Sequence, residues 1–459
     1  MEFLSIEFFA FLTFAVCVFY SVPPRWRSRY LLTISYLLCL VWSPASAVSL
    51  LCMSLFAFKA GAVIAVSGDK VRKLLLFSSL VFTAGTLVVF KLLNSVDNLI
   101  LPLGISFYSF KLLSYLLEVY WGEEPAADFF AFLLYPAFFP QIVAGPIQRA
   151  PDFLAQVEDR FASPACLARI NEGFRFILGG LLLKFVLADR LALFNTTIDG
   201  NSSAYTRTTL LLVACCYTLQ LYSDFAGYSN IALGLGKLFG VDGPRNFAAP
   251  FAATNLPEMW RRWHISLTSW IADYVFMPLQ MALRDLRQWG LIFSVAISMI
   301  LVGIWHGLTI NFFAFGAFHA FFVCLTTLTA GWRKRLLGRR RAALIASQII
   351  GIVVTFVLMT FSQIFWHLRT WGEAADRVWH MAGLSPNGSL NIFSLPQSTT
   401  NGALASIPVI LFIGAGCPGL ATIRKPFAGA PNWISLACGL LLLSVLRVQS
   451  GLGFIYGQF

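Results

Sequence analysis

The chain has 459 residues, of which 58% are hydrophobic and only 12% are charged, and its mean hydropathy is +0.75. Soluble domains carry about 25% charged residues, so this composition excludes a soluble globular protein and indicates a polytopic membrane protein. The formal net charge of +12 does not indicate a nucleic-acid partner, because the basic residues stand in short clusters between apolar runs, which is the pattern of cytoplasmic membrane loops.

Apolar runs of about 20 residues predict membrane-spanning helices, since the hydrocarbon core of a bilayer is about 30 Å thick. The short alternating segments of a membrane β-barrel do not occur in the sequence, so the expected fold class is all-α. The first run carries Glu2 and Glu7 in place of a basic leader, which predicts a first span rather than a signal peptide. We expect about eleven or twelve transmembrane helices in a single domain over residues 1–459, from the apolar runs near 3–21, 30–43, 47–66, 74–93, 101–121, 174–194, 208–228, 290–308, 311–330, 345–366, 402–418 and 432–449.

The basic clusters fix the expected orientation in the membrane, because cytoplasmic loops are enriched in Lys and Arg. We assign to the cytoplasm the clusters at 25–29, 70–73, 333–335, 339–341 and 424–425. With this assignment, the alternation of sides leaves two apolar or aromatic segments that cannot be ordinary spans.

The first of these segments is 129–147, which contains Pro136, Pro140, Gly145 and Pro146. We expect a helix that is broken by proline and that enters the membrane and returns, which is tolerated only where protein or a wet cavity satisfies the freed backbone groups. A kinked but complete span is the alternative.

The second segment is 255–279, where a helix cap is expected before Pro257 and Glu258. Aromatic rings beside charged groups are typical of an interface or a water-filled cavity. We therefore expect this segment to lie at the cytoplasmic face or to re-enter there. Its aromatic and polar residues are Trp260, Arg261, Arg262, Trp263, His264, Trp270, Asp273 and Tyr274.

The apolar stretch 290–330 has basic residues on both flanks, which predicts a hairpin of two spans with its turn near Asn311. His306 stands near the end of the first arm, and an ionisable group at membrane depth is costly and is usually functional. Gly303 and Gly307 allow a backbone or a ligand to approach closely. A buried imidazole is expected to be neutral at pH 7, as a general base must be. A histidine that is only hydrogen-bonded between helices is the alternative.

The remaining histidines are interpreted by their position. His319 lies on the second arm of the hairpin and is equally compatible with the site and with a neighbouring helix. His367 and His380 border the polar segment 367–401, which we expect outside the membrane as a solvated loop with Trp366, Trp371 and Trp379 as interfacial anchors.

No metal site is expected. Three imidazoles could converge on a metal ion, but no H-E-x-x-H motif occurs and no carboxylate stands at ligand spacing from His306. The nine cysteines form no C-x-x-C pair, so neither a zinc site nor a disulfide framework is predicted.

Four motifs in this order resemble the membrane-bound O-acyltransferase family. They are QLYSDFAGYSNIA at 220–232, MWRRWHISLTSW at 259–270, GIWHG at 303–307 with Asn311 and His319 after it, and FIYGQF at 454–459. Within the family, the chain is most similar to the bacterial branch that holds the membrane subunit of alginate O-acetylation and its cellulose-acetylating relatives. The D-alanyl transfer protein of teichoic acids is a close cousin of that branch.

The resemblance implies that an acyl thioester enters a central tunnel from the cytoplasm and that the acceptor approaches from the other side. His306 matches the invariant histidine of the family, and His264 matches its second polar position. The resemblance also implies a multi-pass protein of the bacterial inner membrane with an extracytoplasmic partner of the SGNH-hydrolase type, within a polysaccharide synthase complex. After Pro278 and Leu279 the chain lacks the paired glycines common in the alginate type, which leaves the donor and the acceptor open.

The resulting hypothesis is an O-acyltransferase that moves acetyl from acetyl-CoA to an exopolysaccharide such as alginate or cellulose. His306 would be the general base, with His264 and Asn311 as supporting polar groups. Arg261 and Arg262, with Trp263 beside them, would bind the coenzyme, since guanidinium groups suit phosphate oxygens.

Three alternatives remain open at the level of sequence. The nearest is transfer of D-alanyl from a carrier-protein thioester toward teichoic-acid-type polymers. A transporter would also contain broken segments and a buried histidine, but the stretch 290–330 has no Asp or Glu for a coupling ion. The third alternative is a subunit of a synthase complex without activity of its own.

Overall fold

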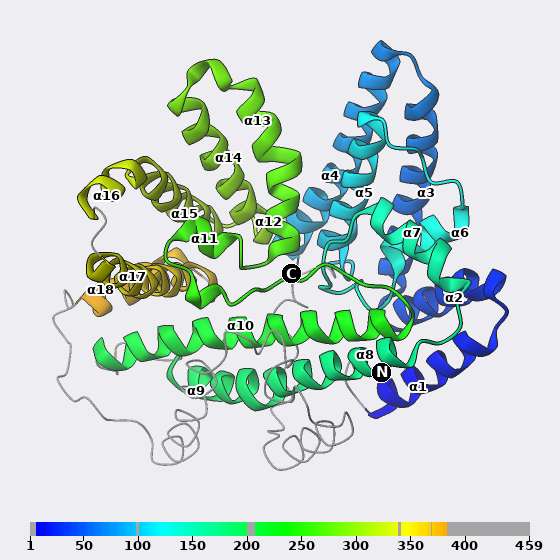
Figure 1. The fold of residues 1–459 in the computed structure, drawn as a ribbon, viewed down its shortest axis with the longest axis horizontal. Helices are drawn as coiled ribbons and strands as arrows, with labels where there is room; N and C mark the ends of the chain where they lie inside the picture. The colour runs from blue at the N-terminus through cyan, green and yellow to red at the C-terminus, as the bar shows by residue number, and fades with distance from the viewer. Residues whose placement is uncertain (1–5, 98–100, 200–206, 338–340, 369, 383–459) are drawn as a thin grey trace. The chain divides into compact units, whose positions relative to one another are not determined.

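The computed structural model describes residues 6–97, 101–199, 207–337, 341–368 and 370–382. Over these residues the secondary structure is helical, with one isolated antiparallel bridge between Phe247 and Trp263 (Figure 1). The expected all-α class is confirmed. The runs predicted near 402–418 and 432–449, and the motif at 454–459, lie outside the described residues.

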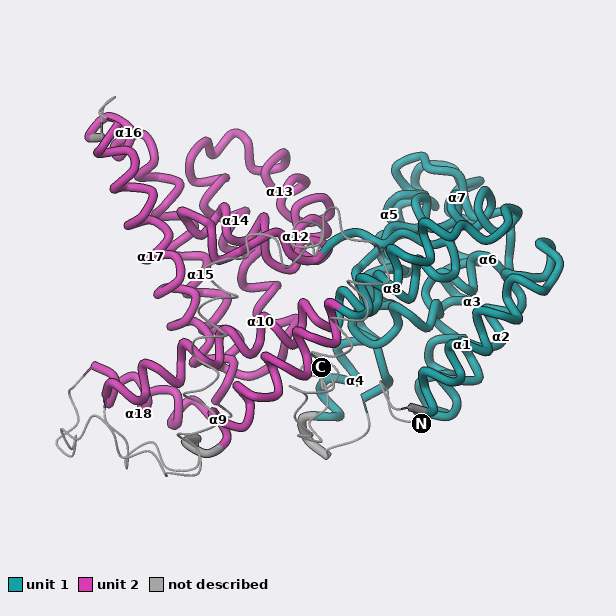
Figure 2. The backbone as a smooth tube through the Cα atoms, turned by 60° about the horizontal axis from the view of Figure 1, so that its bottom comes forward, with its two compact units in different colours: residues 1–178, 228–245, 456–459 teal, residues 179–227, 246–455 magenta. Residues whose placement is uncertain are grey.

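The chain forms two compact units (Figure 2), and the expectation of a single domain stays a prediction. Unit 1 comprises residues 1–178, 228–245 and 456–459. Its helices are α1 (Ile6–Ser21), α2 (Pro24–Trp42), α3 (Pro44–Val66), α4 (Asp69–Asp97), α5 (Ile105–Trp121), α6 (Phe129–Ala137), α7 (Ala150–Phe161) and most of α8 (Leu167–Leu181).

Unit 2 comprises residues 179–227 and 246–455. The long helix α10 (Arg207–Leu238) contributes to both units. The other elements of unit 2 are the π-helix η1 (Leu182–Ala188), α9 (Asp189–Asp199), η3 (Pro250–Ala252), α11 (Leu256–Trp260), α12 (Ile265–Ile271), the π-helix η4 (Ala272–Phe276), α13 (Met277–Ala282), η5 (Arg284–Leu286), α14 (Gln288–His306), α15 (Ile310–Leu328), α16 (Ala330–Leu337), α17 (Arg341–His367) and α18 (Trp371–Ala382).

Six of the described helices are long and apolar enough to cross a membrane, namely α3, α4, α10, α14, α15 and α17. A shorter apolar helix covers Glu7–Ser21. A polytopic membrane protein is therefore confirmed, while the full count of eleven or twelve spans stays a prediction. The predicted run 174–194 is divided among α8, η1 and α9 instead of forming one regular α-helix.

The break predicted in 129–147 is present in unit 1. Helix α6 contains Pro136 in its last turn and ends at Ala137, and the chain continues to Arg149 without another helix. Nine helical residues span only about 14 Å, which is too short for a complete crossing. Return of this segment to the same membrane face stays a prediction.

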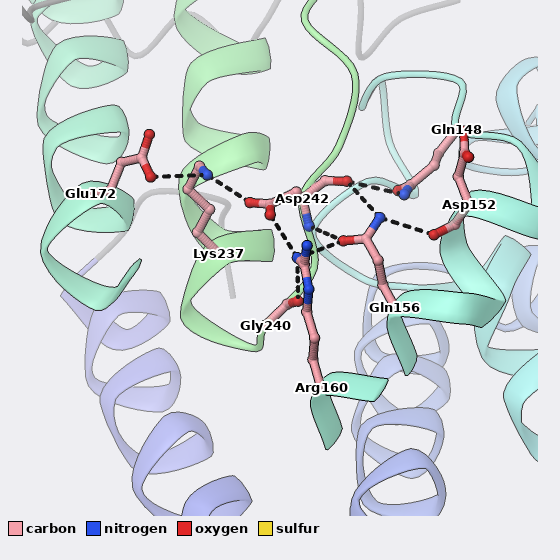
Figure 3. A network of polar contacts seen from close by, with 8 residues as sticks. All are labelled: Gln148, Asp152, Gln156, Arg160, Glu172, Lys237, Gly240 and Asp242. Atoms are coloured by element: carbon pink, nitrogen blue, oxygen red, sulfur yellow. Dashed lines mark hydrogen bonds and ion pairs between the residues drawn. The ribbon is translucent and has the colours of Figure 1, made fainter. Parts of the chain in front are cut away.

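A polar network in unit 1 anchors the loop that follows α10 (Figure 3). Lys237 donates to Asp242 Oδ1 at 2.6 Å and Arg160 donates to Asp242 Oδ2 at 2.6 Å. The main-chain N–H of Asp242 donates to Gln156 Oε1 at 2.7 Å. Burial alone would raise the pKa of Asp242, but the hydrogen bonds from Lys237 and Arg160 outweigh it, and the pKa lies below its usual value.

The predicted hairpin of unit 2 is confirmed by α14 and α15, which are joined by the short turn 307–309 (Figure 1). Glycine makes their close approach possible. A Cβ added at Gly303 would lie 2.2 Å from the carbonyl oxygen of Phe312, and one at Gly316 would lie 2.7 Å from that of Met299. The two backbones therefore touch where any larger residue would separate them.

Candidate functional site

The residues singled out by the sequence come from three parts of unit 2. The hairpin α14–α15 carries His306, Asn311 and His319, and the segment around α11 and α12 carries His264. Helix α17 adds Trp366, a residue expected as an interfacial anchor.

His306 is the last residue of α14 and is only 5% exposed. Its ring centroid lies 4.1 Å from that of Trp366 and 4.5 Å from that of Trp305. The rings of Phe312 and Phe315 each lie 6.3 Å away. The imidazole is therefore enclosed by aromatic walls that limit its contact with water.

The interpretation of Trp366 as an interfacial anchor is wrong. Its side chain is only 7% exposed, because α17 packs against α15 and turns the indole toward His306 and Phe312. Trp371 and Trp379 are 49% and 57% exposed, as an interfacial position requires. Trp366 thus belongs to the wall of the candidate site, a role that its place beside a polar loop concealed.

His264 has a left-handed backbone, with φ of 45°, a region that non-glycine residues rarely occupy and that is often strained. Its carbonyl accepts the N–H groups of Leu267 and Thr268, so the unusual conformation starts α12. Its buried ring lies 4.6 Å from that of Phe225 and 5.9 Å from that of Trp305. Burial lowers the pKa of His264 to about 3, so the ring is neutral at pH 7.

Asn246 holds the chain beside His264 in place. Its carbonyl accepts the N–H of Ile265 at 2.9 Å, and its side-chain oxygen accepts the hydroxyl of Ser266 at 2.6 Å. The bridge between Phe247 and Trp263 lies immediately alongside. The predicted helix cap is also confirmed, because Asn255 Oδ1 accepts the N–H of Glu258 at 2.9 Å.

His319 proves to face the same aromatic cluster, a question that the sequence left open. Its Nδ1 accepts a hydrogen bond of 3.3 Å from Trp260 Nε1, so the proton of the neutral ring is assigned to Nε2. Within the described part of the chain, that Nε2 has no hydrogen-bond partner. The ring of Phe315 lies 4.6 Å from His319 and 6.3 Å from His306 and so connects the two.

Asn311 is buried at the start of α15. Its Nδ2 donates to the carbonyl oxygen of Leu368 at 2.8 Å, which ties α15 to the residue after α17. This bond fixes the end of the helix that carries Trp366. Asn311 therefore supports the wall around His306, and its assignment as a catalytic group stays a prediction.

The three residues predicted to bind a coenzyme lie in different environments. Arg261 is exposed. Arg262 donates to Glu258 Oε1 at 2.7 Å, in a half-exposed ion pair. Trp263 is buried, with its ring 5.2 Å from Phe247. Only the two arginines carry a charge and are accessible, and coenzyme binding by the three residues stays a prediction.

Chemically, this arrangement offers buried imidazoles in an aromatic cluster, with Trp305 beside both His306 and His264. Such rings can take or give a proton at a hydroxyl group. Among the residues that the structure describes, no group of three or more His, Cys, Asp or Glu could hold a metal ion.

Comparison with known proteins matches residues 125–368 to the family model of the membrane-bound O-acyltransferases. The matched region contains His264, His306, Asn311 and His319. It covers 244 of the 459 residues, which is more than half of the chain.

Individual relatives are similar over much of the sequence. The probable alginate O-acetylase AlgI of Pseudomonas fluorescens is 31% identical over 336 residues, 70% of this chain and 65% of the relative. The peptidoglycan O-acetyltransferase of Helicobacter pylori is 26% identical over 313 residues, 63% of this chain and 58% of the relative. The teichoic acid D-alanyltransferase of Bacillus subtilis is 31% identical over 280 residues, 58% of this chain and 68% of the relative. The chain spans 65% of the length of the probable alginate O-acetylase and 58% of that of the peptidoglycan O-acetyltransferase, less than two thirds of each.

Proposed function

The chain belongs to the membrane-bound O-acyltransferase family, and from this premise we propose that it is an O-acyltransferase that moves acetyl from acetyl-CoA toward an exopolysaccharide such as alginate or cellulose. The similarity to relatives named as alginate O-acetylases supports the polysaccharide route. The single observation that carries the proposal is the burial of His306 at the end of α14 inside an aromatic wall.

In the proposed reaction, His306 removes the proton from an acceptor hydroxyl as its oxygen attacks the thioester carbonyl. The new C–O bond forms and the C–S bond breaks, and the proton passes from the imidazole to the departing thiolate. The aromatic wall suits this step, because it limits the access of water that would hydrolyse the thioester. His264, which is neutral and whose ring lies 5.9 Å from that of Trp305, supports the tetrahedral intermediate, and Asn311 fixes the wall.

The wider setting follows from the same proposal. Arg261 and Arg262 bind the coenzyme phosphates at the cytoplasmic face, beside Trp263, and the two substrates meet in a central tunnel. The protein is one catalytic domain in a bacterial inner membrane. An extracytoplasmic protein of the SGNH-hydrolase type receives the acyl group and passes it to the polymer, within a polysaccharide synthase complex.

The test uses membrane vesicles that contain the full chain together with the extracytoplasmic partner and the acceptor polymer, and that receive isotope-labelled acetyl-CoA on the cytoplasmic side. The wild type should transfer label to the polymer. His306→Ala should transfer label about 10²- to 10⁴-fold more slowly, because this is the usual contribution of a general base to the rate. The matched control is His380→Ala, because His380 lies on α18 and bonds to its own helix at Asp376. Full transfer by His306→Ala at equal protein level would remove His306 as the base.

The nearest alternative, transfer of D-alanyl, is tested with a second acyl donor. The similarity to teichoic acid D-alanyltransferases is the observation that supports this alternative. The same vesicles receive a D-alanyl carrier-protein thioester in place of acetyl-CoA. If only the carrier thioester supports transfer, the transferred group is D-alanyl and the proposed acetyl donor is wrong. If neither donor supports transfer, the proposed acyl transfer is refuted, and a transporter or a synthase subunit without activity of its own becomes the better interpretation.

A further inference from the structure

Unit 2 contains a buried ion cluster that the proposed reaction does not use. Lys184 Nζ lies 2.9 Å from Asp189 Oδ1 and 2.8 Å from Asp224 Oδ1. The three side chains are at most 4% exposed. Buried charges carry a desolvation cost even when they are paired, and ionisable groups on membrane helices are usually functional. We call these residues the Lys184 cluster.

The π-helix η1 is what makes the cluster possible. Lys184 and Asp189 are five residues apart, and in a regular α-helix, with 3.6 residues per turn, their side chains would point about 140° away from each other. In η1 the N–H of Asp189 bonds to the carbonyl oxygen of Lys184, which is the wider π-type turn. The wider turn brings the ammonium and the carboxylate to the same side, where both meet Asp224.

The cluster joins η1 and α9 to one point on α10, and that point adjoins the candidate site. Asp224 is followed directly by Phe225, whose fully buried ring stands perpendicular to that of His264 at 4.6 Å. Three residues after Asp224, a Cβ added at Gly227 would lie 2.9 Å from the carbonyl oxygen of Gly180. Helix α10 is thus held by close contacts at Asp224 and at Gly227, which flank Phe225 in the sequence.

We propose that the Lys184 cluster is a positioning device, which holds α10 in the register that places Phe225 against His264. This inference rests on the proposed acyl transfer and deepens it, because it identifies Lys184, Asp189 and Asp224 as positioning residues of that reaction. They act through Phe225 and do not touch the substrate.

The experiment compares Asp224→Asn with the matched control Asn195→Leu. Asn195 donates to Gln220 Oε1 at 2.6 Å and so also joins α9 to α10, but at a position that precedes Phe225 by five residues. A misplacement of about 1 Å costs on the order of 10²-fold in rate. Asp224→Asn should therefore lower kcat by about 10²-fold, with KM for acetyl-CoA changed less than about twofold. Lys184→Arg, which keeps the charge, should retain more activity than Lys184→Met.

Labelling of His264 gives a second readout that does not depend on activity. In the wild type the buried ring should react slowly with diethyl pyrocarbonate, as followed by mass spectrometry of the full chain. Asp224→Asn should speed the labelling of His264 several-fold and leave that of His319 unchanged, whereas Asn195→Leu should change neither.

The outcomes separate this inference from the proposed function. A wild type that transfers no acyl group refutes the proposed function, and the labelling of His264 then decides the positioning role alone. The inference is overturned if Asp224→Asn and Asn195→Leu behave alike in kcat and in labelling. If Asp224→Asn does not fold, Phe225→Leu tests the contact itself, and an unchanged kcat and unchanged labelling in that variant also overturn it.

Discussion

Replacing Gly303 by Ala should impair the candidate site by displacing His306. The added Cβ would lie 2.2 Å from the carbonyl oxygen of Phe312, whereas ordinary contact begins at 3.4 Å. The atom in the way belongs to the backbone, so α14 and α15 must separate by about 1.2 Å, the difference between those two distances. His306 follows Gly303 within one helical turn and is carried along, away from Phe312 and Phe315.

The magnitude follows from that displacement. A shift of about 1 Å in a reacting group costs on the order of 10²-fold in rate, which corresponds to about 2.7 kcal/mol of activation free energy. Overpacking of a helix contact lowers the free energy of unfolding by about 1–3 kcal/mol. Gly303→Ala should therefore reduce kcat about 10²-fold and lower the melting temperature.

The assay measures the rate of acetyl transfer in vesicles together with thermal unfolding in detergent. Gly85→Ala is the matched control, because Gly85 lies within α4 and a Cβ there would meet nothing within 4 Å. That variant should be neutral or slightly more stable, since alanine favours a helix over glycine. A Gly303→Ala protein with wild-type kcat would refute the argument that backbone contact fixes His306.

Three further predictions concern the candidate site in unit 2 and the polar network in unit 1. Trp366→Ala should lower the free energy of unfolding by about 3–5 kcal/mol and slow acyl transfer, with Trp366→Phe affected less in both measurements. Arg262→Gln should raise KM for acetyl-CoA, and Glu258→Gln, which frees Arg262 from its ion pair, should lower it; opposite or absent shifts in both would remove Arg262 from the coenzyme site. Because the pKa of Asp242 is lowered in the folded state, its contribution to stability is complete above its unfolded pKa of about 3.9 and is lost as pH falls through the folded pKa. Melting temperatures measured from pH 6 downward should thus decline less in Asp242→Asn than in the wild type.

Local sequence signals predicted the local structure of both units well. The basic flanks of 290–330 indicated two arms, and α14 and α15 end at a turn between His306 and Asn311. The cap at Asn255 and the proline break at Pro136 depend on neighbouring residues only, and both are present. These features could be read because their causes lie within a few residues of one another.

Long-range contacts could not be read in this way. Trp366 was assigned to the interface by its position before a polar loop, but its burial depends on how α17 packs against α15, where the contacting Phe312 and Phe315 stand more than 50 residues earlier. The π-turn at Lys184 leaves no mark in hydrophobic periodicity, and the pairing of Lys184 with Asp224 joins residues 40 positions apart. The left-handed backbone of His264 likewise stands beside a contact that is distant in sequence, since the N–H of Ile265 bonds to the carbonyl oxygen of Asn246. The roles of His306, His264 and Asn311 remain predictions.

The glycine contacts between α14 and α15 also limit how the protein can open during turnover. Two helices that meet backbone to backbone have no side-chain layer in which to slide, whereas shear motions need packed side chains that can shift past one another. The hairpin that carries His306 is therefore the rigid element of the candidate site. Any rearrangement that opens a path to His306 must therefore come from the elements around the hairpin, among them α17, whose Trp366 ring lies 4.1 Å from that of His306.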